Sequence, residues 1–424
     1  MKILIVTHFF PPSSAIASER LLSFAKYWSL AGHDVSVLTT KKPEEYNFSL
    51  PNVNVIQSEF MPKFFKGFVS NSKVLVNNSD VAKISWFGRV KLKLFKLINS
   101  YGGFSSIRFP DVTSFWPYLV KLDHIGNGYD FVVSSHGPYT SHALAYRIVK
   151  KKLASRWVMD YRDLWNDNYM YPGLPFIRVI ERFLEAKYIN ASDLVTTVSY
   201  SLAEKLMNSF STKVNVIENG YEESELKDNN IEIDSGNSKF VLSYFGSVYP
   251  VYRDPYLLLK AISLLVEDSF FDETQLEVRF YGAGGEFVKD RISEFGLERF
   301  VRHCGNVSRA ESCFLQSSAD ILFLVESSKE KGVMTTKLFE YLYSRNVVLA
   351  IGVESESDIG NLLSHFDNCH AVNDLDSLVF LIKKYFSMKN NGLKISRDNL
   401  GQIELYNRKS KAIEMLSLME NIDR

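Results

Sequence analysis

Short, continuous runs of apolar and β-branched residues alternate with longer amphipathic stretches along the whole chain. Runs that are apolar at consecutive positions are typical of parallel strands, because helices cover both faces of a parallel sheet. The pattern therefore predicts an α/β protein built from parallel sheets. We expect strands at residues 3–6, 34–39, 130–135, 156–160, 194–199 and 214–219 in the first half, and at 240–246, 276–282, 319–325 and 346–352 in the second.

A polar stretch without hydrophobic period, residues 223–239, separates the two halves and is expected to be a linker. We expect one Rossmann-like doubly wound domain at 1–222 and a second at 240–402. A final helix within about 403–424 is expected to pack back on the first domain. Two such domains are expected to face each other across a cleft, with ligands bound at the carboxyl ends of the strands.

The composition of the 424-residue chain, 46% hydrophobic and 23% charged, is that of a folded globular protein. Lysine plus arginine equals aspartate plus glutamate, 49 each, so net charge indicates no nucleic-acid partner. The three cysteines show neither CxxC pairs nor metal-ligand spacing, which favours a reducing compartment and predicts no metal site. No apolar run approaches the ~18 residues of a membrane-spanning helix. The first run is too short for a signal peptide, and we expect a cytoplasmic protein.

The stretch YFGSVYPVYRDPYLLLKA, residues 244–261, joins a predicted strand to a predicted helix. Gly246 allows a tight turn, Asp254 is a good N-cap and Pro255 suits the first helical position. Free amides at a helix start favour an anion, and Arg253 adds a fork of donors that matches phosphate oxygens. The alternative is that Arg253 only pairs with Asp254 or another carboxylate.

A second helix start, in GVMTTKLFEYLYSRNVVLAIG, has a similar design. Thr335 can cap the helix, and Lys337 and Glu340 fall on its first turns. A carboxylate placed one turn behind phosphate-binding amides could accept hydrogen bonds from sugar hydroxyls. Alternatively, Glu340 only complements the helix dipole.

These segments resemble the donor domain of GT-B-fold retaining glycosyltransferases, specifically glycosyltransferase family 4. The resemblance implies that Arg253 holds the donor diphosphate and that Glu340, in the KxxEYL-like segment, contacts the ribose. It also implies that the loop with Gly305 and Val307 holds the base. The implied donor-binding residues are Gly246, Ser247, Arg253, Gly282, Gly305, Val307, Thr335, Thr336, Lys337 and Glu340. Two positions depart from the family pattern: Gly332 replaces a glutamate that touches the transferred hexose, and Ser247 replaces an arginine.

The first half resembles the acceptor domain of the same family. Its opening strand, proline loop and helix lie in HFFPPSSAIASERLL, where Ser14 and Ala15 replace a frequent glycine pair. DYRDLWNDN, residues 160–168, resembles a DxRDxW signature. The acceptor-binding residues implied are Ser14, Ala15, Arg20, Arg162 and Trp165.

Other polar and aromatic residues follow strands of the first half. His136, directly after the strand at 130–135, could hydrogen-bond a sugar hydroxyl or the leaving phosphate; alternatively it is a satisfied loop histidine. Asp163 could accept the acceptor proton as a base, or could hold Arg162 in a salt bridge. Trp165 and Trp116 could stack on an acceptor sugar, although core packing is the commoner fate of tryptophan. The predicted catalytic residues are His136, Arg253, Glu340 and Asp163.

Between residues 62 and 108 the chain carries nine basic residues and a single acid, Asp80. In WFGRVKLKLFKLI, residues 86–98, an apolar helical face lies opposite Arg89, Lys93 and Lys96. Such a helix is typical of interfacial membrane binding to an anionic leaflet, or of an ordinary surface helix packed on the core.

The resemblance implies a metal-independent, cofactor-free retaining glycosyltransferase, acting from a nucleotide-sugar donor on a glycan or lipid-linked acceptor. Family analogy points to bacterial surface polysaccharide such as O-antigen, at the inner face of the cytoplasmic membrane. Two alternatives remain: a nucleotide-sugar epimerase of the same fold, and a non-catalytic protein that binds a nucleotide or glycan.

Overall fold

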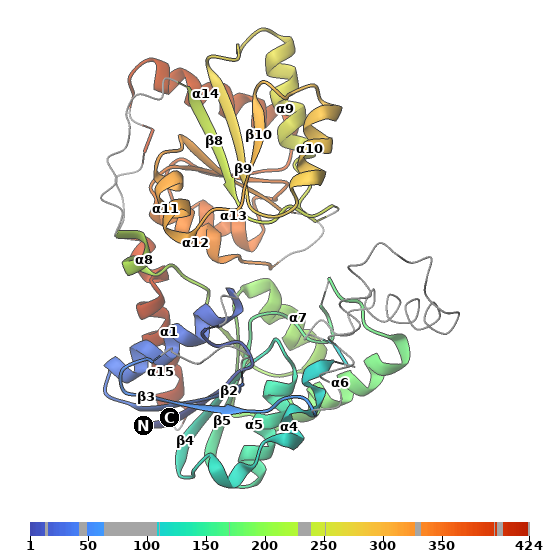
Figure 1. Ribbon diagram of the computed structural model, residues 1–424, viewed down its shortest axis with the longest axis vertical. Coiled ribbons are helices and arrows are strands. Elements are labelled where there is room, and N and C mark those ends of the chain that lie inside the picture. The colour runs from blue at the N-terminus through green and yellow to red at the C-terminus, as the bar shows by residue number, and fades with distance from the viewer. Residues whose placement is uncertain are drawn as a thin grey trace. The chain divides into compact units, whose positions relative to one another are not determined.

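The structure, a computed structural model, forms two compact units. Unit 1 comprises Met1–Ile217 and Ala412–Arg424, and unit 2 comprises Glu218–Lys411. Each unit is a parallel sheet with helices on both faces (Figure 1). The described residues are 1–12, 16–41, 49–62, 108–109, 111–168, 170–227, 239–250, 252–326, 332–393, 395–396 and 402–422.

The described strands of unit 1 pair in the order β3-β2-β1-β4-β5-β6-β7, all parallel. The strands are β1 (Lys2–Val6), β2 (Asp34–Thr40), β3 (Val53–Ser58), β4 (Tyr129–Ser135), β5 (Ala154–Tyr161), β6 (Leu194–Thr197) and β7 (Val214–Val216). The helices are α1 (Ile16–Leu30), η2 (Val112–Phe115), α4 (Trp116–Leu119), η3 (Leu122–His124), α5 (Thr140–Lys150), α6 (Pro175–Ile189), α7 (Tyr200–Phe210) and, from Ala412 on, α15 (Arg408–Glu420).

The central strand β1 shows why a continuous apolar run forms this sheet. Ile3 and Ile5 point into one hydrophobic cluster, while Leu4 and Val6 point into another on the opposite face. Helices cover both faces, so every position of the strand needs an apolar side chain. The final helix α15 belongs to the first of these clusters, which it shares with Trp28, whose Nε1 donates to the carbonyl of Ala412 at 2.8 Å.

The described strands of unit 2 pair in the order β10-β9-β8-β11-β12-β13, again all parallel. The strands are β8 (Phe240–Phe245), β9 (Leu276–Tyr281), β10 (Val301–Gly305), β11 (Ile321–Val325), β12 (Val347–Ile351) and β13 (Cys369–Val372). The helices are α8 (Glu223–Lys227), α9 (Tyr256–Glu267), α10 (Gly285–Glu294), α11 (Arg309–Ser317), α12 (Thr336–Tyr343), α13 (Asp358–Leu363), α14 (Leu375–Asn390) and η4 (Ile403–Tyr406).

The prediction of two doubly wound parallel-sheet domains is confirmed. The sequence missed three strands, β3, β10 and β13, because each is short and interrupts its apolar positions with polar ones, as in VRHCG of β10. It also missed α8, which lies in the stretch expected to be a linker.

Candidate functional site

The strand order of unit 2 reverses between β8 and β11, which pair directly. In open α/β sheets, ligands bind outside the carboxyl ends of the strands at such a reversal. Gly246 follows the end of β8, and Glu326 follows the end of β11. The side chains around these two strand ends are therefore the first candidates for a functional site.

Arg253, in the loop between β8 and α9, forms an ion pair with Glu326. Its Nη2 lies 3.3 Å from Oε1 of Glu326, and its Nε donates to Oε2 at 3.4 Å. Both side chains are mostly buried. Asp254, the pairing partner considered from sequence, instead accepts from Arg291. The guanidinium of Arg253 is thus directed to the strand ends and is held there by an acid that follows β11.

Lys337 of α12 brings a second cation to the same strand ends. Its Nζ donates to the Tyr244 hydroxyl at 3.3 Å and lies 4.7 Å from the centre of that ring. A Cβ on Gly246 would overlap this ammonium group. Gly246, whose φ is 153°, has no side chain and so provides the space in which the Lys337 ammonium lies.

The cluster of Arg253, Lys337 and Glu326 carries excess positive charge. Burial raises the pKa of Glu326 although both cations oppose this shift. Burial, together with the charge of Arg253, lowers the pKa of Lys337 to about 8. At neutral pH Arg253 and Lys337 therefore share the carboxylate of Glu326, while Glu340, which also acts on Lys337, is paired with Arg309, and water solvates the two cations poorly. An anion would relieve this imbalance.

Glycine turns tie the carboxyl ends of β8, β9 and β10 together. The amide of Gly246 donates to the carbonyl of Tyr281 at 2.7 Å, and the amide of Gly282 donates to that of Gly305 at 2.8 Å. A Cβ on Gly282 would overlap the Gly246 carbonyl, so only glycine fits there. Ser247 contributes its carbonyl, which accepts from the Tyr244 hydroxyl at 2.9 Å. These hydrogen bonds fix the turn after β8, against which the Lys337 side chain lies.

The two helix starts differ from the sequence prediction in detail. Pro255, not Asp254, is the N-cap of α9, and the carboxylate of Asp254 accepts from the amide of Tyr256 at 3.1 Å. The expected Asp254 N-cap was therefore wrong by one residue. Thr335 is the N-cap of α12 as expected, but its side chain makes no capping bond, and Thr336 is the first helical residue.

Glu340 of α12 is buried and paired. Its Oε1 accepts from Nη2 of Arg309, the first residue of α11, at 2.7 Å. The same Nη2 lies 2.9 Å from a carboxylate oxygen of Glu225. Arg309 is partly exposed and Glu340 is not, so the guanidinium covers the carboxylate. Val307 lies two residues before Arg309, is partly buried and packs against the apolar cluster that contains Leu338.

In unit 1, Arg20 and Asp160 form a closed pair. Arg20 of α1 donates from Nε and Nη2 to the two oxygens of Asp160 at 3.1 and 2.9 Å. Ser135 and Thr196 each donate to the same carboxylate at 2.9 Å. Burial alone would raise the pKa of Asp160, but Arg20 and these hydroxyls lower it. Arg20, expected to bind the acceptor, is thus a buried partner of Asp160 in this structure.

His136 follows β4 and is almost fully buried. Neither of its ring nitrogens has a hydrogen-bond partner among the described residues. The rings of His142, Tyr161 and Trp165 lie 5.9, 5.9 and 6.2 Å from it. Burial, reinforced by His142, lowers the pKa of His136 well below its usual value, so the imidazole is neutral. The alternative of a hydrogen-bond-satisfied loop histidine does not fit these two unpartnered nitrogens.

Arg162 and Asp163 are paired with each other. Nε of Arg162 donates to Asp163 at 3.1 Å, which is the salt bridge considered from sequence. The Arg162 guanidinium also lies against Gly137, where an added Cβ would be 2.9 Å from Nη2. Arg162 thus reaches the residue that follows His136.

Trp165 and Trp116 are core residues. Both are fully buried, and Trp165 stacks on Tyr139 with ring centres 4.9 Å apart. Trp116 donates from Nε1 to Ser58 at 2.8 Å. In this structure neither ring has a face open to a sugar, so the expected stacking role is corrected to core packing.

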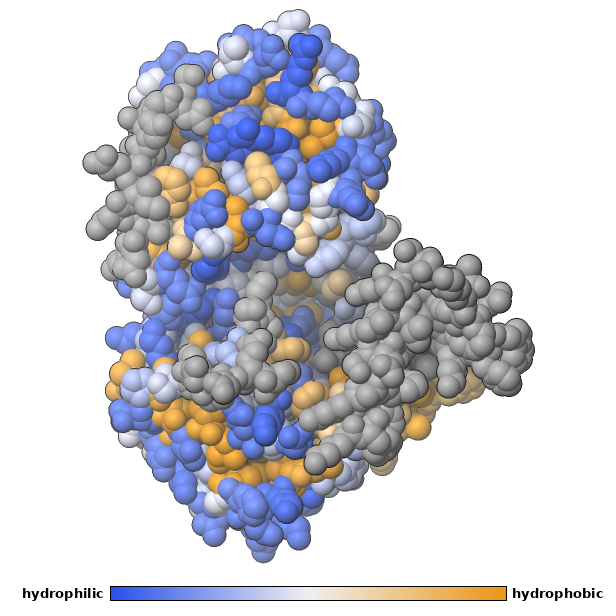
Figure 2. Space-filling view, in the orientation of Figure 1, coloured by the Kyte–Doolittle hydropathy of each residue, from blue (hydrophilic) through white to orange (hydrophobic). Residues whose placement is uncertain are grey.

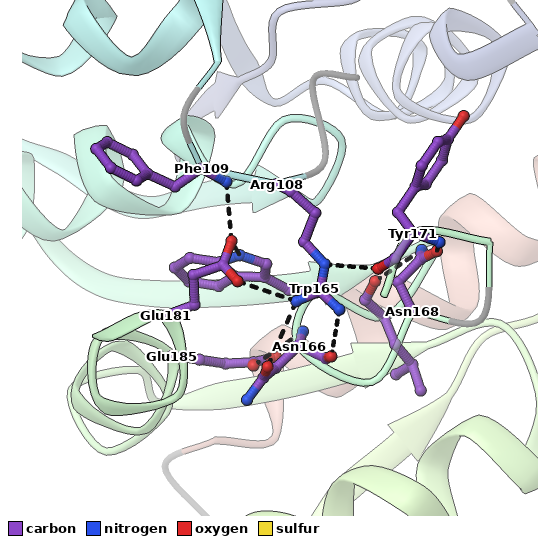
Figure 3. A network of polar contacts seen from close by, with 9 residues as sticks. Arg108, Phe109, Trp165, Asn166, Asn168, Tyr171, Glu181 and Glu185 are labelled. Atoms are coloured by element: carbon purple, nitrogen blue, oxygen red, sulfur yellow. Dashed lines mark hydrogen bonds and ion pairs between the residues drawn. The ribbon is translucent and has the colours of Figure 1, made fainter. Parts of the chain in front are cut away.

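A buried polar network in unit 1 escaped the sequence analysis (Figure 3). Arg108 bonds Glu181 at 3.1 Å and the carbonyls of Asn166 and Tyr171 at 2.5 and 2.8 Å. Glu181 also accepts from the amide of Phe109 at 2.8 Å. The network joins α6 to the DYRDLWNDN segment. Its only sequence signal is that two acids share a helix otherwise rich in apolar residues.

Ser14 and Ala15, and the basic residues Arg89, Lys93 and Lys96, lie outside the described residues. Among the residues that the structure does describe, no helix is long and apolar enough to cross a bilayer. The same part of the chain holds no group of three or more His, Cys, Asp or Glu side chains placed to bind a metal ion.

No protein-family model matches the sequence, and no curated protein matches it significantly. Solved structures are similar over the whole chain. Sucrose-phosphate synthase from Thermosynechococcus elongatus has a TM-score of 0.68 at 13% identity, covering 100% of this chain and 99% of that one. A glycosyltransferase from Rickettsia africae has a TM-score of 0.64 at 14% identity, covering 100% of this chain and 98% of that one. HepE of Anabaena, solved with UDP-glucose, has a TM-score of 0.55 at 13% identity, covering 100% of this chain and 96% of that one. The fold is thus that of two-domain GT-B glycosyltransferases.

Proposed function

We propose that this protein is a retaining glycosyltransferase that moves a sugar from a nucleoside-diphosphate sugar to a glycan acceptor. One observation carries the proposal: Arg253 and Lys337 concentrate positive charge at the sheet reversal of unit 2. Similarity over the full length to HepE, solved with UDP-glucose, supports a nucleotide sugar as the anion.

The cluster suits the departure of a diphosphate. When the bond from sugar to phosphate breaks, negative charge grows on the leaving oxygen. Arg253 offers a planar fork to two phosphate oxygens and Lys337 offers a point charge, both fixed in advance by Glu326 and Tyr244. The first amides of α12 add donors. We propose that these groups supply the countercharge without a metal ion.

Glu340 is proposed to bind the ribose of the donor. Because Arg309 covers the carboxylate, the sugar would reach Glu340 after the guanidinium moves aside. Arg309 also pairs with Glu225, and this second acid can hold the guanidinium once it has moved away from Glu340. The base is proposed to lie beside Gly305, where an added Cβ would meet only open space.

Unit 1 is proposed to bind the acceptor and to contribute His136. A neutral imidazole with two unpartnered nitrogens can donate to, and accept from, a sugar hydroxyl or phosphate. Arg162 and Asp163 lie beside Gly137 and are proposed to contact the acceptor. We further propose a lipid-linked acceptor of bacterial surface polysaccharide and membership of glycosyltransferase family 4.

The donor is identified by thermal stability against a panel of UDP-, GDP-, ADP- and CMP-sugars. A cognate donor at a hundredfold excess over its Kd stabilises the fold by about 2.7 kcal/mol. We expect one nucleotide class to raise Tm and the others to leave it unchanged. If none does, the proposed donor site is wrong.

Two variants test the roles of the site residues. Arg253→Ala and Glu340→Ala are expected to lower kcat/KM for transfer by roughly a hundredfold or more. The matched control is Arg299→Ala, an exposed arginine of the same unit paired with Glu273 at 3.6 Å, which should keep wild-type rates. Near wild-type transfer by both site variants would contradict the proposal. Donor turnover to an epimer without acceptor would favour the epimerase, and binding without turnover a non-catalytic protein.

A further inference from the structure

Over its first two turns, helix α6 of unit 1 has large apolar side chains on the outside, and both of its acids are buried; Tyr188 and Ile189 at its end are core residues. Glu181 and Glu185 are each 1% exposed. Phe176, Val179 and Phe183 are 91, 72 and 68% exposed. This is the reverse of an ordinary amphipathic helix on a globular protein, which turns its apolar face to the core.

The exposed apolar residues form one stripe. Phe176, Val179, Ile180 and Phe183 stand at spacing i, i+3, i+4 and i+7, which places them on one face over two turns. Phe109 is also half exposed, and its amide bonds Glu181 of the helix, so it lies next to the stripe. Figure 3 shows its ring turned away from the buried network. Single exposed apolar residues are ordinary, but a contiguous stripe is typical of an interaction surface.

Basic residues flank this stripe. Arg178, Arg182 and Lys187 are exposed, and the helix has no exposed acid because Glu181 and Glu185 are buried. Arg182 bonds the carbonyl of Ser209 at 3.4 Å, and Lys187 lies 4.9 Å from the ring centre of Tyr146. The outward face of α6 is thus apolar in its centre and purely cationic at its edges. By contrast, hydrophilic side chains cover most of the visible face of unit 2 (Figure 2).

The inverted orientation is fixed by the buried network. Glu181 accepts from Arg108, from the amide of Phe109 and from Trp165. Glu185 accepts from the Tyr161 hydroxyl and the Asn166 amide, and burial raises its pKa to about 8. Turning the apolar stripe inward would leave Arg108 buried without its partner acid, which is strongly unfavourable. The buried network therefore holds the stripe on the outside, although this leaves its apolar side chains in contact with water.

We propose that the outward face of α6 docks on an anionic lipid bilayer. An apolar centre with a basic rim is the composition of helices that lie in the membrane interface. The most basic stretch of the sequence, nine basic residues and one acid between residues 62 and 108, enters the described structure at Arg108 and Phe109, beside α6. Its charge has the same sign as that of α6. Repulsion between like charges therefore disfavours a second copy of α6 as the occupant, whereas an anionic lipid surface attracts the basic rim.

This proposal concerns lipid binding and does not depend on the transfer activity. The test is flotation of the purified full chain with phosphatidylcholine vesicles containing about one third phosphatidylglycerol, and with phosphatidylcholine alone. We expect binding to the anionic vesicles that weakens as salt rises, and little binding to neutral ones.

Two variants separate the apolar from the ionic contribution. Phe176→Ser with Phe183→Ser should lower the vesicle partition coefficient roughly tenfold or more, because each phenyl ring loses its burial. Arg178→Glu with Arg182→Glu keeps the apolar stripe and should abolish the preference for anionic lipid. The matched control, Phe380→Ser, removes a similarly exposed phenylalanine from α14 of unit 2 and should bind as wild type does.

Unchanged Tm in each variant shows that the fold is kept. Wild-type binding by the double serine variant, or no binding of the wild-type protein to anionic vesicles, would overturn the proposal. So would sedimentation that shows a dimer lost in the serine variant without any vesicle binding, since α6 would then be a self-association surface.

Discussion

An arginine meets a carboxylate near the carboxyl end of a parallel strand in both units, with different consequences. In unit 1, Asp160 accepts two bonds from Arg20 and one each from two hydroxyls, and the side chain is fully buried. In unit 2, Glu326 meets Arg253 at 3.3 Å, both side chains are mostly buried, and Lys337 is a second cation nearby. The first pair has one cation and one saturated carboxylate, whereas the second has two cations beside one carboxylate.

The difference shows how the same residue types make a structural pair or a binding site. The two oxygens of Asp160 each accept two bonds, so the carboxylate has no acceptor capacity left and Arg20 balances its charge. The Arg253 cluster sets two mostly buried cations, Arg253 and Lys337, against the carboxylate of Glu326. Charge balance, rather than the presence of an arginine, distinguishes the two.

The largest expected effect breaks the closed pair. Asp160→Asn leaves Arg20 buried without a countercharge and should lower the free energy of unfolding of unit 1 by about 3–5 kcal/mol. Tryptophan fluorescence during urea denaturation reports on unit 1 alone, since all five tryptophans lie in residues 1–217. Asp163→Asn, at the partly exposed pair with Arg162, is the control and should cost at most about 1 kcal/mol. Equal losses in both variants would remove the distinction drawn here.

The next effect concerns the charge of Lys337, whose pKa is lowered to about 8. Below that pH the ammonium is charged and ready for a diphosphate; above it, binding must take up a proton. Donor affinity measured by calorimetry should therefore be level below about pH 7.5 and fall up to tenfold per pH unit above 8. Lys337→Arg keeps the charge at all these pH values and should flatten the profile. An unchanged slope in Lys337→Arg would exclude Lys337 as its cause.

Folding stability should move in the opposite direction over this range. The lysine pKa is lower in the folded state than the usual 10.5, so the unfolded chain binds more protons between about pH 8 and 10.5. The contribution of Lys337 to stability therefore rises with pH there, while donor binding falls.

The smallest expected effect comes from Gly246→Ala. The added Cβ would displace the flexible Lys337 ammonium and would place an L residue at a φ of 153°, so the free energy of unfolding should fall by roughly 1 kcal/mol. Because the ammonium would leave its place near Tyr244, donor affinity should fall severalfold, by roughly 1 kcal/mol. Gly392→Ala, at a turn with positive φ and open space for a Cβ, is a control for the backbone effect alone. A loss of affinity in both variants would point to backbone strain instead.

The sequence predicted the sheets well because their central strands are apolar at every position, as in β1 and β8. It also placed Arg253 and Lys337 in loops or helix starts after strands. Glu326 could not be assigned as the partner of Arg253, because the pair joins residues 73 positions apart through the adjacency of β8 and β11. A charged residue directly after an apolar run was the available signal.

Unit 1 shows the limit of pattern reading more clearly. Arg20, expected at the acceptor, is held by Asp160, 140 residues away in the chain, and Trp165 is enclosed by rings from other elements. The inversion of α6 depends on Arg108, which lies outside the helix and determines which face is buried. Long-range ion pairs of this kind have no periodicity in the sequence.

The central claim is that the Arg253 cluster of unit 2, and not the Arg20 pair of unit 1, is the seat of the donor diphosphate. A crystal structure with a bound nucleoside diphosphate tests it most directly. The account predicts phosphate oxygens about 3 Å from the Arg253 guanidinium and the Lys337 ammonium, with the Arg20–Asp160 pair intact. A diphosphate bound elsewhere, with Arg253 still held only by Glu326, would contradict it.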